Sequence, residues 1–212
     1  MEVKEAYNIW AEQYDTNDNK TRDLEAISLR NMLSNITFNQ CLEIGCGTGK
    51  NTEWIISRAD KVLAVDLSPN MLEKAKTKVQ SDWVNFVQAD MSEDWFFTEG
   101  AKFDLAVFSL VLEHIKNLDS IFDKLKEVIV EDGYVYIGEL HPFKQYSGSK
   151  ARFETEEGLQ VVKCYTHHIS DFIQAAKRNG FKIAELSEFF DEGVEAPIPR
   201  ILAMLFRKQE SA

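Results

Sequence analysis

The residues Cys41-Leu-Glu-Ile-Gly-Cys-Gly-Thr-Gly-Lys50 set the architecture of this chain. Their apolar start is typical of a buried strand, and the segment that follows is compatible with a helix. The alternate glycines Gly45, Gly47 and Gly49 can take backbone angles that other residues avoid, so a ligand can approach the main chain closely. The helix that follows offers free N–H groups to an anion. This stretch therefore predicts a loop that binds a nucleotide cofactor.

Two better-known phosphate-binding loops fit the stretch poorly. A dinucleotide fingerprint requires G-x-G-x-x-G, but the third glycine comes one residue early, at Gly49, and Lys50 stands where that pattern has glycine. A phosphate loop requires glycine at the position of Ile44 and serine or threonine at the position of Asn51. Both interpretations are weakened.

Further segments of strand-like and helix-like character follow in a regular order. Several of the strand-like segments end in an acid or a small polar residue, where a parallel sheet places its ligands. In chain order these segments are Lys61–Asp66, the helix opening Leu67–Leu72, Val84–Met91 with Asp90, Phe103–Ser109, Val111–His114 and Gly133–Gly138.

With the Glu-x-Gly-x-Gly-x-Gly signature from Glu43 to Gly49, this ordered set resembles the class I S-adenosylmethionine-dependent methyltransferases, of the small-molecule, methyltransferase type 11-like kind. The resemblance runs from about Tyr7 to the C-terminus. It implies S-adenosylmethionine as cofactor, S-adenosylhomocysteine as its product, and methyl transfer to a small molecule. It implies no particular acceptor, and does not distinguish O-, N-, S- or C-methylation.

The alternation of strands and helices from Gln40 onward predicts an α/β fold with a doubly wound, mostly parallel sheet covered by helices on both faces. The resemblance implies a Rossmann-like sheet of seven strands, in which a final hairpin makes the last strand antiparallel. The expected hairpin strands are 181–187 and 200–206, and the expected helices are 21–36, 70–79, 117–129 and 168–179.

Composition favours one globular domain over residues 1–212, since the chain has 212 residues, of which 44% are hydrophobic. Within it we expect an N-terminal helical segment at 1–36 and a substrate-side insertion or lid at 141–168. The N-terminus lacks a basic start and an apolar core, and no stretch approaches the ~20 apolar residues of a membrane span. We expect a soluble, cytoplasmic protein.

The net charge and the cysteine content limit the kinds of ligand and site that we expect. The formal net charge of -11 opposes binding to a nucleic-acid backbone and favours small-molecule substrates. The three cysteines, Cys41, Cys46 and Cys164, are odd in number and lack C-x-x-C spacing, so they predict neither a disulfide framework nor a metal site. The oligomeric state is not readable from the sequence.

The two strand-end acids carry the cofactor assignment. The resemblance implies that Asp66 accepts hydrogen bonds from both ribose hydroxyls and that Asp90 accepts one from the adenine amino group, with Met91 against the ring. A carboxylate suits the first task because it has two acceptor oxygens. The structural alternatives are a helix cap for Asp66 and a turn residue for Asp90.

Other cofactor contacts come from the glycine loop, strand four and the N-terminal segment. Glu43 is expected to organise the loop or the ligand's ammonium group, with a surface-facing strand residue as the alternative. Ser109 is expected near the methionine moiety and Tyr14 as a closing aromatic, whereas Tyr7 and Trp10 equally suit an amphipathic helix on the core. The full predicted set is Tyr14, Glu43, Gly45, Cys46, Gly47, Gly49, Asp66, Leu67, Asp90, Met91 and Ser109.

Acceptor binding is expected from the connection after strand five. A general base is needed only when the nucleophile carries a proton, and imidazole is a common base. His141 is the first candidate, with His167 and His168 beside it, although a packing or surface role competes for each. The expected substrate pocket comprises Glu113, His114, Phe143, Tyr146, Arg152 and Tyr165. For Arg152, a solvated ion pair with Glu154, Glu156 or Glu157 is the default interpretation, and an anionic substrate is the other.

Two other functions remain open at this point. One is a module that binds S-adenosylmethionine without methyl transfer, because fold alone does not establish chemistry. The other is a nicotinamide-dependent oxidoreductase, which the glycine spacing disfavours.

Overall fold

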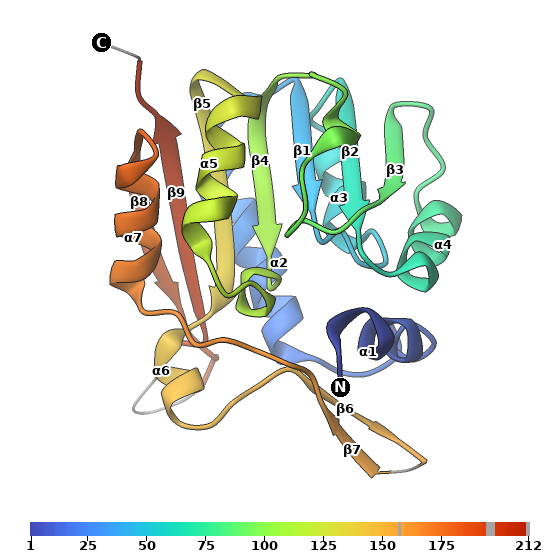
Figure 1. The fold of residues 1–212 in the computed structure, drawn as a ribbon. Coiled ribbons are helices and arrows are strands. Elements are labelled where there is room, and N and C mark those ends of the chain that lie inside the picture. The colour runs from blue at the N-terminus through green and yellow to red at the C-terminus, as the bar shows by residue number, and fades with distance from the viewer. Residues whose placement is uncertain (157, 194–197, 211–212) are drawn as a thin grey trace.

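The computed structural model describes residues 1–156, 158–193 and 198–210. Its helices and strands alternate along most of the chain, as Figure 1 shows. In order they are α1 (Val3–Trp10), α2 (Lys20–Met32), β1 (Gln40–Ile44), α3 (Lys50–Ile56), β2 (Lys61–Asp66), α4 (Pro69–Lys78), β3 (Val84–Gln88), η1 (Phe96–Thr98), β4 (Phe103–Ser109), η2 (Leu112–His114), α5 (Leu118–Val128), β5 (Ile129–Leu140), α6 (Pro142–Tyr146), β6 (Arg152–Thr155), β7 (Gly158–Val161), α7 (Ile169–Arg178), β8 (Phe181–Phe189) and β9 (Ile201–Lys208).

Seven of the strands form one sheet in the order β3-β2-β1-β4-β5-β9-β8. The first five are parallel, and β9 runs antiparallel to both β5 and β8. The predicted seven-stranded, Rossmann-like sheet with an antiparallel last strand is therefore confirmed. The order reverses between β1 and β4, and ligands of such sheets bind beside this switch point, at the carboxyl ends of the strands.

Helices cover both faces of the sheet (Figure 1). On one face, α5 and α7 pack against inward side chains such as Ala106 and Phe108 of β4. On the other, α2, α3 and α4 pack against the alternate residues Leu105 and Val107. Successive residues of a strand point to opposite faces, so the near-continuous apolar run of β4 fits a strand buried on both sides.

The fifth strand is longer than the expected 133–138, because it begins at Ile129. Ile129 and Tyr134 both pair with β4, on either side of a register shift. Between them Asp132 has φ +63°, a left-handed conformation that aspartate tolerates better than most residues. Asp132 and Gly133 thus lie in a bulge within the strand.

The second helix is shorter than the expected 21–36. It ends at Met32, and a turn follows that includes Ser34 and Asn35. Both residue types form local hydrogen bonds that favour turns over a helix interior. The apolar spacing alone therefore overestimated its length.

Helix α1 and the hairpin of β6 and β7 lie together beyond the carboxyl ends of the parallel strands, and we call them the roof (Figure 1). Trp10 of α1 stacks on Phe153 of β6, with ring centroids 4.9 Å apart. Ala6, Ala11, Met71 and Val162 complete this small apolar cluster, which ties the roof to α4. In the described part of the chain, no helix is both long and apolar enough to cross a membrane.

Gly49 and Gly180 allow a test of the packing between the glycine loop and α4. Both have left-handed backbones, with φ +80° and +83°, but a Cβ on Gly49 would lie 3.3 Å from the backbone of Ala75, whereas one on Gly180 meets nothing within 4 Å. We expect Gly180→Ala to lower the free energy of unfolding by about 1–2 kcal/mol through conformation alone. Gly49→Ala should cost about 1–3 kcal/mol more because of overpacking. Equal losses in chemical denaturation would contradict this packing role.

Candidate active site

The three glycines of the loop after β1 serve different purposes. A Cβ on Gly45 would lie 2.6 Å from Cγ2 of Val111, so this glycine lets the loop after β4 approach. Gly47 has φ +53° and only Tyr14 near its Cβ position, at 3.9 Å. Gly45 and Gly47 line a cavity, whereas Gly49 faces α4.

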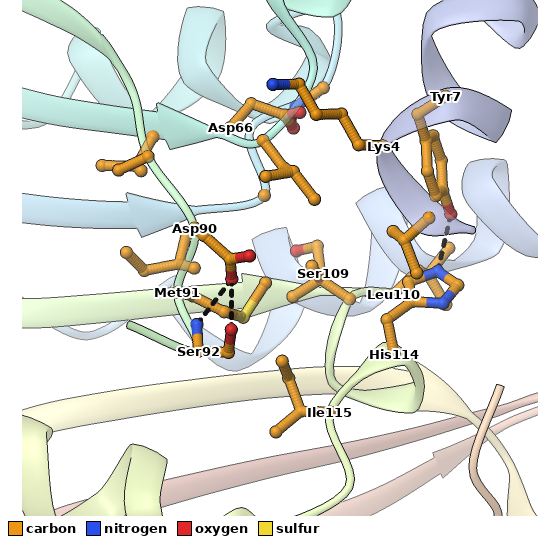
Figure 2. A pocket seen from close by; sticks show the side chains of 18 of the residues that line it. Lys4, Tyr7, Asp66, Asp90, Met91, Ser92, Ser109, Leu110, His114 and Ile115 are labelled. Carbon is orange, nitrogen blue, oxygen red and sulfur yellow. Dashed lines mark hydrogen bonds between the residues drawn. The ribbon is translucent and has the colours of Figure 1, made fainter. Parts of the chain in front are cut away.

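That cavity, here the first cavity, has a volume of about 320 Å³ and lies at the carboxyl ends of β1 to β4 (Figure 2). Its size is in the range of small-molecule sites, about 300–1,000 Å³. Eight of the eleven predicted cofactor residues line it, namely Tyr14, Gly45, Gly47, Asp66, Leu67, Asp90, Met91 and Ser109. The other three, Glu43, Cys46 and Gly49, are not among its described lining residues.

Asp66 joins the glycine loop to the end of β2. The Gly47 N–H donates to Oδ2 at 2.8 Å, and the Ser68 N–H donates to Oδ1 at 2.8 Å. Burial raises the pKa of Asp66, and these backbone donors oppose that rise. Each oxygen keeps acceptor capacity, because a carboxylate has about four lone-pair sites. The side chain can therefore accept two further hydroxyl groups.

Asp90 lies across the first cavity from Asp66 (Figure 2). Its Oδ1 accepts both the Ser92 N–H, at 2.8 Å, and the Ser92 hydroxyl, at 2.6 Å. Among the described residues, Oδ2 accepts no hydrogen bond. The turn role weighed for Asp90 is thus compatible with an oxygen that is available to a ligand.

The buried side chain of Glu43 links β1, which precedes the glycine loop, to α3. Its side chain is only 3% exposed, and the Thr52 hydroxyl of α3 donates to Oε2 at 2.6 Å. Burial raises the pKa of Glu43 to about 8. The surface-facing alternative is wrong, and the hydrogen bond to α3 fits a role in organising the loop.

Tyr7 and His114 form a hydrogen-bonded pair in the wall of the first cavity (Figure 2). His114 Nδ1 lies 2.9 Å from the Lys163 carbonyl, an acceptor only, so Nδ1 carries the ring proton. Nε2 then accepts from the Tyr7 hydroxyl at 2.9 Å. Burial holds the pKa of Tyr7 well above its usual value, which keeps this donor protonated. When the imidazole is neutral, its basic nitrogen thus faces Tyr7.

Glu113, His114 and Cys164 place potential ligand atoms within 4.8 Å of one another. Such groups can bind a divalent ion when they offer lone pairs. His114 approaches Cys164 through Nδ1, at 3.9 Å, and that nitrogen already donates to Lys163. The cluster therefore fits a hydrogen-bonded arrangement better than a metal centre.

The three predicted catalytic histidines are not among the lining residues of the first cavity. His141 caps α6, where Nδ1 accepts the Phe143 N–H at 3.1 Å and Nε2 contacts Glu188 at 2.9 Å. His167 is buried, with Nε2 2.7 Å from the Ile115 carbonyl. His168 is exposed, and its Nδ1 lies 2.7 Å from the Tyr146 hydroxyl. The structure favours structural roles for these side chains and brings His114 to the site instead.

A second cavity of about 250 Å³ lies under the roof and shares Tyr7, Tyr14 and Leu110 with the first. Of the predicted substrate residues, Glu113 and Arg152 line it, and His114 lines the first cavity. Phe143, Tyr146 and Tyr165 line neither. Two adjoining cavities suit a reaction between two bound molecules.

Glu139 fixes the loop after β4, which carries His114. This role was not predicted from the sequence. The side chain of Glu139 is buried, and Oε1 accepts the N–H groups of Val111, at 3.0 Å, and Leu112, at 2.7 Å. Burial raises the pKa of Glu139 to about 8. Leu110 in the same loop has φ +54°, a strained conformation that is often found at functional sites. Only the position of Glu139 directly after the expected strand 133–138 hinted at this role.

Comparison with known proteins identifies a methyltransferase domain in this chain. The methyltransferase domain family matches residues 42–137. An uncharacterized methyltransferase of Emericella nidulans is 27% identical over 88% of this chain and 78% of its own length. The malonyl-[acyl-carrier protein] O-methyltransferase of Priestia megaterium is 34% identical, over 58% of this chain and 45% of its own length.

Solved structures are similar in fold. The DhpI–SAH complex covers 98% of this chain and 95% of its own, with a TM-score of 0.77 and 20% sequence identity. At that identity the likeness establishes the fold alone. The chain therefore carries a methyltransferase domain over residues 42–137 and shares the fold of solved S-adenosylmethionine-dependent methyltransferases.

The hydrogen-bond partners predict opposite tautomers for two histidines. At alkaline pH, where both rings are neutral, ring ¹⁵N NMR should show the proton of His114 on Nδ1 and that of His141 on Nε2. The reason is that Lys163 O can only accept from the first ring, and Phe143 N–H can only donate to the second. A proton on Nε2 of His114 would contradict its assignment as a basic nitrogen facing Tyr7.

Proposed function

We propose that this chain transfers a methyl group from S-adenosylmethionine to a small molecule. The observation that carries the proposal is the convergence of Asp66, Asp90 and the Gly45–Gly47 backbone on one cavity at the switch point of the sheet. Asp66 would hold the ribose hydroxyls through its remaining acceptor sites, and Asp90 Oδ2 would accept from the adenine amino group.

When bound, S-adenosylmethionine supplies an electrophilic methyl group on a sulfonium. The protein's task is then to align the nucleophile and to exclude water. Ser109, at the end of β4, lines the first cavity. The next residue, Leu110, lines both cavities. Tyr14 and α1 cover the site, which supports a closing role for the N-terminal segment.

The Tyr7–His114 pair would remove the proton of a protonated nucleophile. Tyr7 lines both cavities, and its hydroxyl donates to His114 Nε2. A substrate proton can pass to the Tyr7 oxygen while the Tyr7 proton passes to Nε2. The resulting imidazolium lies close to Asp66 and Glu113, whose pKa values its charge lowers. Positioned general bases of this kind contribute about 10²–10⁴-fold to rate.

The second cavity supports a small-molecule acceptor, since its volume of about 250 Å³ suits a metabolite-sized group. The net charge of -11 disfavours nucleic acid. A cytoplasmic location and the absence of a membrane partner remain predictions. The two adjoining cavities, with Tyr7 in the wall of both, favour an enzyme over a module that only binds the cofactor.

Calorimetric titration tests the cofactor. We expect S-adenosylmethionine and S-adenosylhomocysteine to bind, and NADH not to. Asp66→Ala should weaken S-adenosylhomocysteine binding by about tenfold or more, because it removes hydrogen bonds to a charged acceptor. Asp60→Ala, at an exposed aspartate directly before the same strand, is the matched control and should bind as the wild type. Preferential binding of NADH would overturn the proposal.

The production of S-adenosylhomocysteine tests transfer itself, with an acceptor identified by screening small acids and alcohols. His114→Gln should retain cofactor affinity but lower turnover by about 100-fold or more, since glutamine cannot take a proton. His168→Gln alters an exposed histidine outside both cavities and should leave turnover unchanged. Full activity in His114→Gln would remove His114 as the base.

A further inference from the structure

The second cavity carries a charge opposite to that of the whole chain. Its described lining includes four cationic side chains, Arg22, Lys150, Arg152 and Arg200, and one acidic side chain, Glu113. The chain as a whole has a formal net charge of -11. A local excess of positive charge in a concave site concentrates anions. This contrast makes the cavity electrostatically distinct.

The four cations differ in how far their charge is already compensated. Arg200 makes a bidentate pair with Asp191, at 2.5 and 2.6 Å. Arg22 donates to the backbone carbonyls of Tyr14 and Asn17, which carry no net charge. Within the described residues, Lys150 and Arg152 form no ion pair or side-chain hydrogen bond, so Arg152 pairs with neither Glu154 nor Glu156, and Glu157 lies outside the described residues. Three charges therefore remain for a ligand.

Buried polar atoms without partners point to the same cavity. Trp10 Nε1, Arg22 Nε and Glu113 Oε2 each lack a hydrogen bond, and all three residues line it. A buried group without a partner is costly, so each implies an additional partner. Two of the three are obligate donors, which suits an anion. Burial also raises the pKa of Glu113, which favours its neutral form.

We propose that the methyl acceptor carries an anionic oxygen group, a carboxylate or a phosphate, which binds in the second cavity between Arg22, Lys150 and Arg152. This inference rests on the proposed function and names its substrate class. Tyr7 and Leu110 line both cavities, so an acceptor anchored in the second can extend its nucleophile to the Tyr7–His114 pair. Arginine suits such an anchor because its planar fork matches these anions.

The test is calorimetric titration of the S-adenosylhomocysteine-saturated protein with malonate, inorganic phosphate and neutral malonamide. We expect at least one anion to bind at least about tenfold more tightly than malonamide, and more weakly as salt rises. The relative affinities of malonate and phosphate then distinguish a carboxylate from a phosphate anchor. If neither anion binds better than malonamide, the inference is overturned.

Matched variants locate the binding site. The double variant Lys150→Gln, Arg152→Gln should weaken binding of the preferred anion by about tenfold or more, because it removes two charged donors. Lys182→Gln, an exposed lysine of β8, should have no effect. Each variant should bind S-adenosylhomocysteine like the wild type. Unchanged anion affinity in the double variant would refute this site, whereas failure of the wild type to bind S-adenosylhomocysteine would refute the proposed function instead.

Discussion

The carboxylate of Asp66 is the contact on which the site depends. It accepts one N–H from the glycine loop after β1 and one from the start of α4, and so fixes the ends of two neighbouring strands against each other. Because β1 and β2 are parallel, their carboxyl ends meet at the same edge. A single buried acid thus shapes the loop while keeping acceptor capacity toward the first cavity.

The roof supplies what the sheet cannot. Helix α1 and the β6–β7 hairpin cover the carboxyl ends of the parallel strands, and the stacking of Trp10 on Phe153 joins these two elements. This stacking carries Tyr7 to the wall between the two cavities, where it meets His114. Aromatic pairs of this kind contribute about 0.5–1.5 kcal/mol each beyond their burial. Packing of the roof and assembly of the site are therefore linked.

The sequence predicted the sheet well because its signals are local. Each parallel strand is a short apolar run with a turn or a polar residue at its end. Eight of the eleven predicted cofactor residues line one cavity, and seven of these, all but Tyr14, lie at or just after strand ends. The assignments that depend on side-chain direction were harder. Glu43 and Gly49 belong to the same motif, yet they point toward α3 and α4, which no spacing reveals.

The acceptor side depends on contacts between distant segments, and the sequence gives little access to them. His141 directly follows a strand, but Phe143 and Glu188 occupy its two ring nitrogens. His114 reaches the site because Lys163, forty-nine residues later, orients its ring. The cations of the second cavity come from 22, 150–152 and 200, and only the folded chain brings these positions together.

A crystal structure of the complex with S-adenosylhomocysteine would test the central claim most directly. The account predicts that the ribose hydroxyls contact Asp66, that the adenine lies beside Asp90 and Met91, and that the sulfur lies near Tyr7, which lines both cavities. Adenosine bound elsewhere, or ribose hydroxyls without contact to Asp66, would contradict it.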